Sequence, residues 1–318
     1  MTAPAIEIDR LTKDYTLGFV RKRAVRALDA VSLTVQRGEI FGFLGGNGAG
    51  KTTTIKILMR LMFPTSGTAR IAGRPIDDVA MHARVGYLPE QPYFYDYLTA
   101  REFLEYCAQL FGVPKRQRRP RAEALLARVH LDPGAWNRQM RRFSKGMLQR
   151  VGLAQALVND PEVVILDEPM SGLDPIGRRQ VRDLIAGLRA QGTTVFFSSH
   201  IIADIEVLCD RVAILQSGRV AHVGRLDELR QRVDASGRLE ITVVGADHRA
   251  VGDAVGKVEG AEVTTSPGGA RITVPSERDV DAVLAAVRQC GARLVSVQPV
   301  RQSLEDLFVG DSPRPHSD

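Results

Sequence analysis

The sequence contains no apolar run that approaches the roughly 18 residues of a membrane-spanning helix. Its first residues, MTAPAIEIDR, also lack the charged and then apolar pattern of a secretory signal, so we expect a cytosolic chain unless another protein holds it at a membrane. Cysteine is scarce, because only Cys107, Cys209 and Cys290 occur, far apart and without a C-x-x-C pair. This spacing argues against a disulfide framework and a zinc site, and we interpret all three as packing residues.

No aromatic residue interrupts the main basic run, KRQRRPR at residues 115–121, and no nucleic-acid-binding fold is recognisable around it. A net charge of +6 would suit the phosphate groups of nucleic acid or of anionic lipid. Without interleaved aromatics the run is more typical of a solvated surface, and we expect no nucleic-acid partner. The length of 318 residues allows about two domains, and 44% hydrophobic residues are ordinary for a globular protein.

A glycine-rich stretch at residues 45–52, GGNGAGKT, fits the pattern G-x-x-x-x-G-K-[ST]. The apolar run EIFGFL precedes it and helix-compatible sequence follows at 52–61, so the stretch lies where a strand passes into a helix. This context is typical of a phosphate-binding loop, whereas an ordinary glycine-rich turn is the alternative interpretation. The residues predicted to bind nucleotide are Gly45, Gly46, Asn47, Gly48, Ala49, Gly50, Lys51, Thr52 and Thr53.

Each part of this loop has a physical role in the prediction. Glycine at positions 45, 46, 48 and 50 opens backbone conformations that a Cβ would forbid, so that successive N–H groups can converge on phosphate oxygens. The helix that follows adds the positive end of its dipole. Lys51 is predicted to bridge the β- and γ-phosphates, and the Thr52 hydroxyl is predicted to be a ligand of Mg²⁺.

Strands and helices alternate over most of the chain, which predicts a parallel sheet with helices on its faces. Ligands of such sheets bind at the carboxyl ends of the strands, where Thr52, Asp167, Glu168 and His200 all fall. The elements predicted for this part are two antiparallel strands (4–11 and 31–35), a hairpin near 66–75, buried strands (85–89, 163–166, 194–197 and 211–215), a mostly helical insert at about 92–145, and helices (147–158, 177–191 and 201–209).

Two acidic residues that follow the apolar run VVIL at 163–166 provide the chemistry of the predicted site. Asp167 can hold the coordination sphere of Mg²⁺. Glu168 can orient the water that attacks the γ-phosphate or accept its proton, an effect worth about 10²- to 10⁴-fold in rate. A glutamate that merely lies at the surface of a strand end is the alternative for Glu168.

The composition shifts at about residues 232–237, a polar stretch that we interpret as a linker. We expect domains at 1–232 and 238–310 and a disordered tail at 311–318. No catalytic constellation lies in the second domain, so we predict an accessory or dimer-contact role for it. Its predicted elements are typical of a small α+β domain of the ferredoxin-like βαββαβ kind: strand 239–244, helix 248–258, strands 261–265 and 271–274, helix 277–290 and strand 293–298.

The motifs described above, in the order in which they occur along the chain, resemble those of the ATP-binding subunits of ABC transporters over about residues 5–230. The resemblance also rests on Gln91, the segment SKGMLQR at 144–150, the segment SGLD at 171–174, and His200. The segment FSKGMLQR and the C-terminal SLEDLF are similar to the ABC-2 branch, whose members are usually exporters or ATPases associated with a permease. The resemblance implies an α/β P-loop ATPase fold with a parallel core sheet, an antiparallel β subdomain and a helical insert.

The resemblance also implies how the site works. Two copies, or this chain and a homologous subunit, would sandwich two ATP molecules and power a separate integral membrane permease at the cytoplasmic face of the membrane. Glu168 would act as the base, Gln91 would sense Mg²⁺ and the attacking water, and His200 would hydrogen-bond to the γ-phosphate. The remaining implied contacts are Tyr15, which would stack on adenine, Ser144 and Gly146, which would complete the opposite subunit's site, and Asp174, which would couple the two sites.

The chain departs from the usual family signature, Leu-Ser-Gly-Gly-Gln, at Phe143, Lys145 and Met147. Two interpretations of Lys145 are open: it adds a cation near the γ-phosphate bound by the partner subunit, or it is an ordinary solvated lysine. Gly46 replaces a common proline, so we expect a less preorganised loop. The main alternative function is an ABC-type ATPase that acts on nucleic acid or ribosomes, which the short insert and the single phosphate loop disfavour. A nucleotide-binding module without hydrolysis is a third possibility, against which Glu168 and His200 together argue.

Overall fold

The computed structural model describes residues 3–17, 23–228, 238–246, 248–256, 258, 260–266 and 268–299. The chain divides into two compact units, Met1–Leu226 and Asp227–Asp318, each with its own apolar core. The predicted linker at 232–237 and the predicted tail at 311–318 lie outside the described residues. No helix in the described part of the chain is both long and apolar enough to cross a bilayer.

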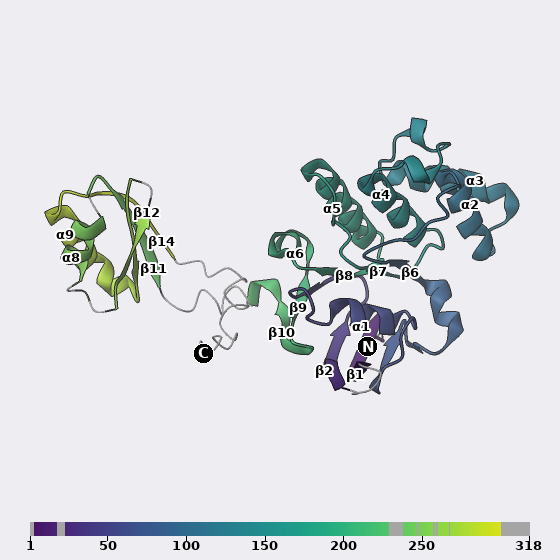
Figure 1. The fold of residues 1–318 in the computed structure, drawn as a ribbon, viewed down its shortest axis with the longest axis horizontal. Coiled ribbons are helices and arrows are strands. Elements are labelled where there is room, and N and C mark those ends of the chain that lie inside the picture. Colours follow the sequence, from purple (N-terminus) through teal and green to yellow (C-terminus); the bar gives the residue numbers. More distant parts are fainter. Residues whose placement is uncertain are drawn as a thin grey trace. The chain divides into compact units, whose positions relative to one another are not determined.

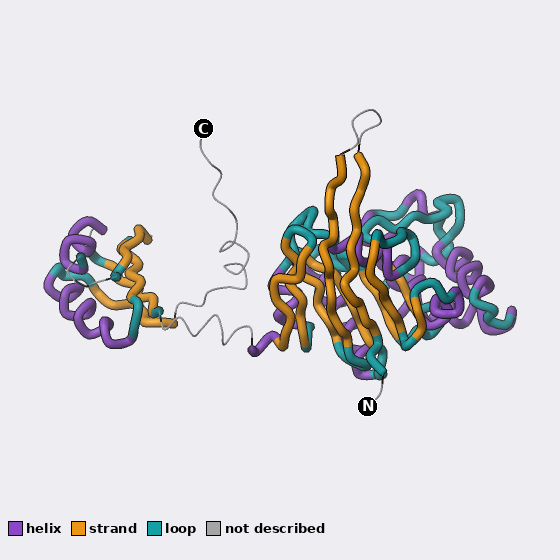
Figure 2. The backbone as a smooth tube through the Cα atoms, turned by 90° about the horizontal axis from the view of Figure 1, so that it is seen from below, coloured by secondary structure: helices purple, strands orange, loops and turns teal. Residues whose placement is uncertain are grey.

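The first unit begins with an antiparallel sheet in the order β2-β1-β4-β5. Its first strand, predicted to end at residue 11, continues to Leu17, so Tyr15 lies on the strand itself. Pairing explains the difference, because β2 begins at Arg23 and the two strands remain paired as far as Leu17 (Figure 2). The strands are β1 (Ile6–Leu17), β2 (Arg23–Val35), β4 (Ser66–Ile71) and β5 (Arg74–Pro75).

The predicted core sheet has six strands in the order β10-β9-β3-β8-β7-β6, of which the last five are parallel. Both β3 and β7 are buried along their whole length, which explains their uninterrupted apolar sequences. The antiparallel strand β10 was not predicted, since its side chains are only partly buried and it lies at the sheet edge. The strands are β3 (Ile40–Leu44), β6 (Val85–Leu88), β7 (Val163–Leu166), β8 (Thr194–Ser199), β9 (Arg211–Gln216) and β10 (Arg219–Arg225).

Helices cover both faces of this sheet. Figure 1 shows α1 between the core sheet and the antiparallel sheet, whereas α4, α5 and α6 lie over the opposite face. Stacked phenylalanines on β3 and β8 fill the layer between the sheet and α1, and the rings of Phe41 and Phe196 lie 5.8 Å apart. The helices are α1 (Lys51–Leu58), α4 (Lys145–Ala156), α5 (Pro175–Ala190) and α6 (Ile202–Leu208), close to their predicted bounds.

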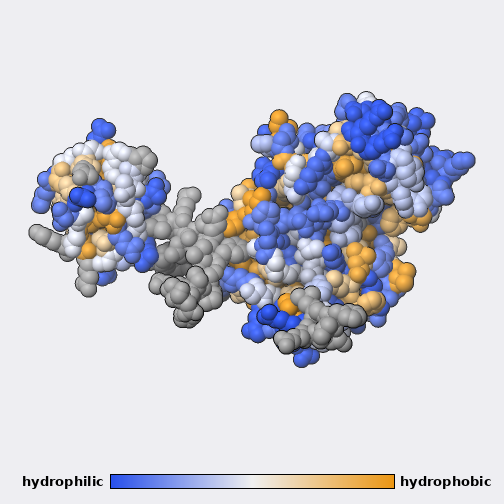
Figure 3. All heavy atoms as spheres, in the orientation of Figure 1, coloured by the Kyte–Doolittle hydropathy of each residue, from blue (hydrophilic) through white to orange (hydrophobic). Residues whose placement is uncertain are grey.

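The predicted helical insert contains α2 (Ala100–Leu110), α3 (Lys115–Arg128) and short 3₁₀ turns, among them η3 (Met140–Arg142). The capping box of Thr99 and Glu102 starts α2. The basic run at 115–121, which the sequence suggested as a solvated surface, forms the start of α3. Arg119 bonds to Glu123 one turn later and supports the turn that contains Pro120. Most of these basic side chains are exposed, and Figure 3 shows a hydrophilic surface over α3.

The second unit is an antiparallel sheet in the order β12-β13-β11-β14, with its core between the sheet and two helices. The observed order β-α-β-β-α-β is the predicted one. The first helix ends three residues earlier than predicted, and the second is preceded by a 3₁₀ turn, η4 (Glu277–Asp279). The elements are β11 (Leu239–Val244), α8 (His248–Val255), β12 (Glu262–Ser266), β13 (Gly269–Val274), α9 (Val280–Gln289) and β14 (Arg293–Pro299).

Candidate active site

A cavity of about 320 Å³ lies at the carboxyl ends of the parallel strands, where the turn between β3 and α1 forms its floor. This position follows from the topology, because parallel strands present their carboxyl ends at one sheet edge and α1 begins there. The cavity is lined by Ala27, Gly46, Asn47, Gly48, Gly50, Lys51, Thr52, Thr53, Glu90 and Glu168.

The glycines of the loop are not equivalent, which corrects the prediction that all four need freedom from a Cβ. Gly48 and Gly50 have φ of 79° and 109°, and a Cβ on Gly50 would lie 2.6 Å from a Leu28 methyl carbon. A Cβ on Gly45 would lie 2.7 Å from a backbone carbonyl oxygen. Gly46, in contrast, is not among the residues with positive φ, and a Cβ there would meet nothing within 4 Å.

Lys51 is buried at the inner wall of this cavity, with 6% of its surface exposed. Its ammonium donates to the carbonyl oxygens of Gly45, at 2.7 Å, and Gly46, at 3.3 Å. It also lies 3.4 Å from Oε1 of Glu168. Because the loop itself holds the ammonium, the positive charge is fixed where the loop N–H groups converge, as a phosphate group requires.

Glu168 connects Lys51 to His200. Its Oε2 lies 2.9 Å from Nδ1 of His200, and only 9% of the residue is exposed. Its backbone has φ of 49°, a left-handed conformation that costs a non-glycine residue on the order of 1 kcal/mol. The Glu168 N–H donates to the Ser198 hydroxyl at 2.9 Å, which helps to hold this conformation. The carboxylate is thus aimed at the phosphate loop by its neighbours on β8.

Asp167 lies behind the cavity wall and is fully buried. Its Oδ1 accepts a hydrogen bond from the Ser198 hydroxyl at 2.6 Å, whereas its Oδ2 has no hydrogen-bond partner among the described residues. Burial raises the pKa of Asp167 above its ordinary value, the hydroxyls of Ser198 and Thr52 oppose that rise, and the charges of Glu90 and Glu168 add to it. A buried, unpartnered carboxylate oxygen next to a hydroxyl and a phosphate loop fits the oxygen ligands that Mg²⁺ prefers.

The structure distinguishes two adjacent polar residues that follow β6, Glu90 and Gln91. Gln91, the predicted sensor, is exposed and is not among the residues that line the cavity, whereas Glu90 lines it. His200 lies on the far side of Glu168, where the two residues line a second cavity of about 140 Å³ together with Asp204. The structure therefore brings Lys51, Thr52, Asp167, Glu168 and His200 together, without Gln91.

Tyr15 lies beside the cavity without lining it. Its hydroxyl is 3.3 Å from Oγ1 of Thr53 and donates to the Met62 sulfur at 3.0 Å. The Lys13 ammonium lies 5.4 Å from the ring centroid. The half-buried ring is therefore anchored at its hydroxyl, next to the first turn of α1.

The remaining predicted contacts lie away from this cavity. The Ser144 hydroxyl accepts a hydrogen bond from the Met147 N–H at 3.3 Å and caps α4, beside Gly146 in its first turn. Asp174 caps α5 in the same way through the Gly177 N–H at 2.9 Å. Both capping residues are exposed at helix N-termini.

Three residues of the site were missed by sequence analysis. Glu90 was passed over for its neighbour Gln91, and Ser198, directly after the predicted strand 194–197, was given no role. Gln149, which is 2% exposed, donates to the Pro169 carbonyl at 2.9 Å and fastens α4 to the segment after Glu168. A polar residue at the end of the apolar run TVFF is the signal that could have identified Ser198, whereas Gln149 is followed directly by Arg150 and has no such signal.

Comparisons with known proteins agree with this geometry. The model of the family described as ABC transporter matches residues 28–171. A Synechocystis protein described as an uncharacterized ABC transporter ATP-binding protein is 45% identical over 308 residues, which cover 96% of this chain and 84% of that protein. The chain belongs to the ABC transporter ATP-binding proteins. It is the ATP-binding subunit of an ABC transporter, and it is an ATPase.

Two further relatives extend the comparison. The daunorubicin resistance ATP-binding protein DrrA3 of Streptomyces coeruleorubidus is 34% identical, over 89% of this ATPase and 90% of that protein. Among solved structures, the dimeric ATP-binding cassette MJ0796, bound to ADP and Pi in a post-hydrolysis state, has a TM-score of 0.65 at 27% identity. This match covers 70% of the ATPase and 98% of the cassette, so the similarity in fold spans a whole ABC cassette.

Proposed function

We propose that this ATPase hydrolyses Mg²⁺-ATP at two sites between two copies of the cassette, and that it drives a separate ABC-2 type permease, an exporter, from the cytoplasmic face of the membrane. The observation that carries the proposal is the contact chain Lys51–Glu168–His200, which starts at the wall of the phosphate cavity with Lys51 and Glu168 and continues behind it to His200. It supports a site in which a cation, a carboxylate and an imidazole would act on a γ-phosphate bound in that cavity.

The residues divide into a binding and a hydrolytic set. The N–H groups of Gly45 to Gly50 and the Lys51 ammonium would hold the phosphates, and Tyr15 would contact the adenine. Thr52 and Asp167 would hold Mg²⁺, which neutralises phosphate charge when it is bound. Glu168 would accept the proton of the attacking water. His200 would orient the Glu168 carboxylate, and its half-exposed ring would also contact the γ-phosphate.

The second copy would complete each site through the N-terminus of α4. That first turn has no acidic residue, and Ser144 and Lys145 are exposed and Gly146 partly exposed, which leaves the positive helix end free to meet an anion. The side chain of Lys145 packs over Gly172, because a Cβ added to Gly172 would lie 2.7 Å from carbon atoms of that side chain. Lys145 therefore supports the SGLD segment, to which Gly172 belongs. The dimeric MJ0796 cassette and its bound ADP and Pi support this arrangement.

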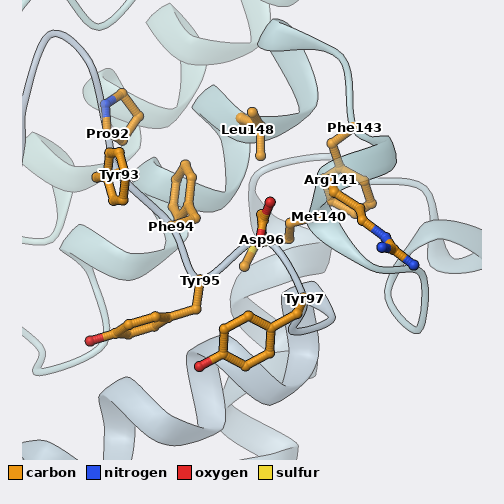
Figure 4. A pocket seen from close by; sticks show the side chains of 10 residues that line it. All are labelled: Pro92, Tyr93, Phe94, Tyr95, Asp96, Tyr97, Met140, Arg141, Phe143 and Leu148. Atoms are coloured by element: carbon orange, nitrogen blue, oxygen red, sulfur yellow. The ribbon is translucent and has the colours of Figure 1, made fainter.

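A patch of exposed aromatic residues supports docking on a permease. The segment Pro92–Tyr97 borders a cavity of about 480 Å³ with Met140, Arg141, Phe143 and Leu148 on its other side (Figure 4). Tyr93 is 97% exposed, and the rings of Tyr95 and Tyr97 lie side by side with centroids 6.1 Å apart. Phe94 packs against Phe103 of α2 and anchors the segment. Exposed aromatics around a groove are typical of protein contact sites, so we assign this docking surface, residues 92–97, to the permease.

Export is the direction that the relatives favour. DrrA3 is described by its association with daunorubicin resistance, and removal of a compound from the cell is a direct route to resistance. The matched region covers 89% of this ATPase, so the comparison includes most of the second unit as well as the cassette. The transported compound would be contacted by the permease, and the residues of this chain do not determine it.

The proposal is tested by measuring phosphate release and oligomeric state, with Mg²⁺ and ATP, for the wild type and Glu168→Gln. We expect the wild type to hydrolyse ATP, and the variant to bind ATP, not turn over, and accumulate as a dimer. Glu277→Gln, the same change at an exposed position of the second unit, serves as the control and should behave as the wild type. Equal turnover by Glu168→Gln would refute the base assignment, and a variant that stays monomeric with ATP bound would refute the two-copy site.

A further inference from the structure

The phosphate cavity contains more negative charge than a site for ATP needs. Among the described residues, Lys51 is the single cationic side chain that lines it, whereas Glu90 and Glu168 both line it and Asp167 lies behind its wall. Two carboxylates thus line a cavity that must accept the negative phosphates, and a third lies behind its wall. Lys51 and His200 already contact Glu168, and Ser198 contacts Asp167. Glu90 has no hydrogen-bond or ion-pair partner within the described part of the chain.

The sheet register explains why Glu90 faces this cavity. Leu88 of β6 pairs with Leu166 of β7 in parallel, and the Asp167 N–H donates to the Leu88 carbonyl at 2.8 Å. Two residues beyond the paired leucines, Glu90 and Glu168 leave their strands at the same level of the sheet. Both reach the cavity, and the charge of Glu90 is close enough to act on Asp167. Gln91, one residue further, is exposed outside the cavity wall.

We propose that Glu90 is a positioning residue for the metal, whose charge makes nucleotide binding depend on a divalent cation. The proposal rests on the proposed function, because it concerns the same Mg²⁺-ATP site. Without a cation, Glu90 repels the phosphates, and with Mg²⁺ present it adds to the negative field that holds the ion. A glutamine at this position would keep the shape and hydrogen-bonding capacity of the side chain and remove both effects.

The experiment compares Glu90→Gln with Gln91→Ala, and measures binding of a non-hydrolysable ATP analogue over a range of Mg²⁺ concentrations and in EDTA. A unit charge that acts through partly exposed solvent over several ångströms changes an ionic equilibrium by about five- to tenfold. We therefore expect Glu90→Gln to bind the analogue about five- to tenfold more tightly in EDTA and to need about five- to tenfold more Mg²⁺ for half-maximal enhancement. Gln91→Ala should change neither quantity.

A charge-preserving variant separates position from net charge. The double variant Glu90→Gln with Gln91→Glu keeps the charge of the chain and moves the carboxylate by one residue. It should behave as Glu90→Gln does. Wild-type values in the double variant would overturn the proposal, as would a change in only one of the two quantities in Glu90→Gln, or equal effects in Gln91→Ala.

These measurements are independent of the tests of hydrolysis and dimerisation. Binding of the analogue requires neither Glu168 as base nor a second copy, so failure of the Glu168→Gln experiment would not produce a negative result here. Conversely, an unaffected Glu90→Gln variant in a protein that still hydrolyses ATP would overturn the role of Glu90 alone. The side chain of Glu90 is exposed to solvent, so we expect its variants to fold. Measurement of their thermal unfolding checks this.

Discussion

The hydroxyl of Ser198 holds both acidic residues of the site, and the variant Ser198→Ala tests that arrangement. Ser198 is fully buried, accepts a hydrogen bond from the Glu168 N–H at 2.9 Å, and donates one to Asp167 Oδ1 at 2.6 Å. The variant leaves a buried donor and a buried carboxylate oxygen without these partners. It also removes a contact that supports the left-handed backbone of Glu168.

The expected cost follows from the two bonds. A neutral hydrogen bond is worth about 1 kcal/mol and one to a charged group about 1.5–3 kcal/mol, so Ser198→Ala should lower the free energy of unfolding by about 2–4 kcal/mol. The turnover number should fall by at least about tenfold, because a displacement of Glu168 moves the base away from the reacting water. The sole tryptophan, Trp136, lies in the first unit, so urea unfolding followed by its fluorescence reports on that unit.

Ser199→Ala is the matched control, one residue along the same strand. Within the described residues its hydroxyl bonds only to the backbone of Ile201, two residues away, so we expect a loss of about 1 kcal/mol and a small change in turnover. If Ser198→Ala costs less than about 0.5 kcal/mol, or if the two variants cost the same, the assignment of Ser198 as the shared support of Asp167 and Glu168 is refuted.

Three further predictions follow from the geometry. Gly46→Ala should bind ATP within about twofold of the wild type, whereas Gly50→Ala should lose more than about tenfold, as equilibrium binding will show, because only the second substitution meets side chains and a positive φ. Mg²⁺-dependent ATP binding should be lost on acidification at a pH above 3.8, the ordinary pKa of aspartate, because burial raises the pKa of Asp167 and only the ionised carboxylate binds metal. A titration of ATP binding against pH measures where this loss occurs. Tyr93→Ser should reduce recovery of the protein with washed membranes and leave its basal ATP hydrolysis unchanged, whereas Phe63→Ser, equally apolar and 63% exposed elsewhere, should change neither.

The phosphate loop shows how far a local pattern leads. The spacing of GGNGAGKT between a strand and a helix predicted the cavity and the placement of Lys51 and Thr52, because the turn is short and its backbone leaves few conformations. The pattern did not show that Gly46 tolerates a side chain. That depends on two residues that are distant in the sequence: Leu28 lies against Gly50, and Leu215 lies against both Gly50 and Gly45, whereas neither is within 4 Å of a Cβ at Gly46.

The two residues after β6, Glu90 and Gln91, show where prediction from the local sequence fails. Glu90 and Gln91 are adjacent, both are polar, and the sequence offers no internal measure of which one faces the cavity. The register of β6 against β7 decides it, because a shift by one residue exchanges the faces to which neighbouring side chains point. The length of β1 was underestimated and β10 was not predicted for a related reason. Pairing with a neighbouring strand can hold residues in a strand where their own apolar alternation does not predict one.

The sequence by itself determined the α/β alternation, the phosphate loop, the carboxylates at the end of β7 and the βαββαβ order of the second unit, because these depend on periodicity and on residues close together in the chain. The tertiary structure alone decided that Ser198 supports both Asp167 and Glu168, that Glu168 lies between Lys51 and His200, and that Glu90 rather than Gln91 faces the cavity. These contacts join segments on different strands, and only the packing and register of the sheet bring them within hydrogen-bonding distance.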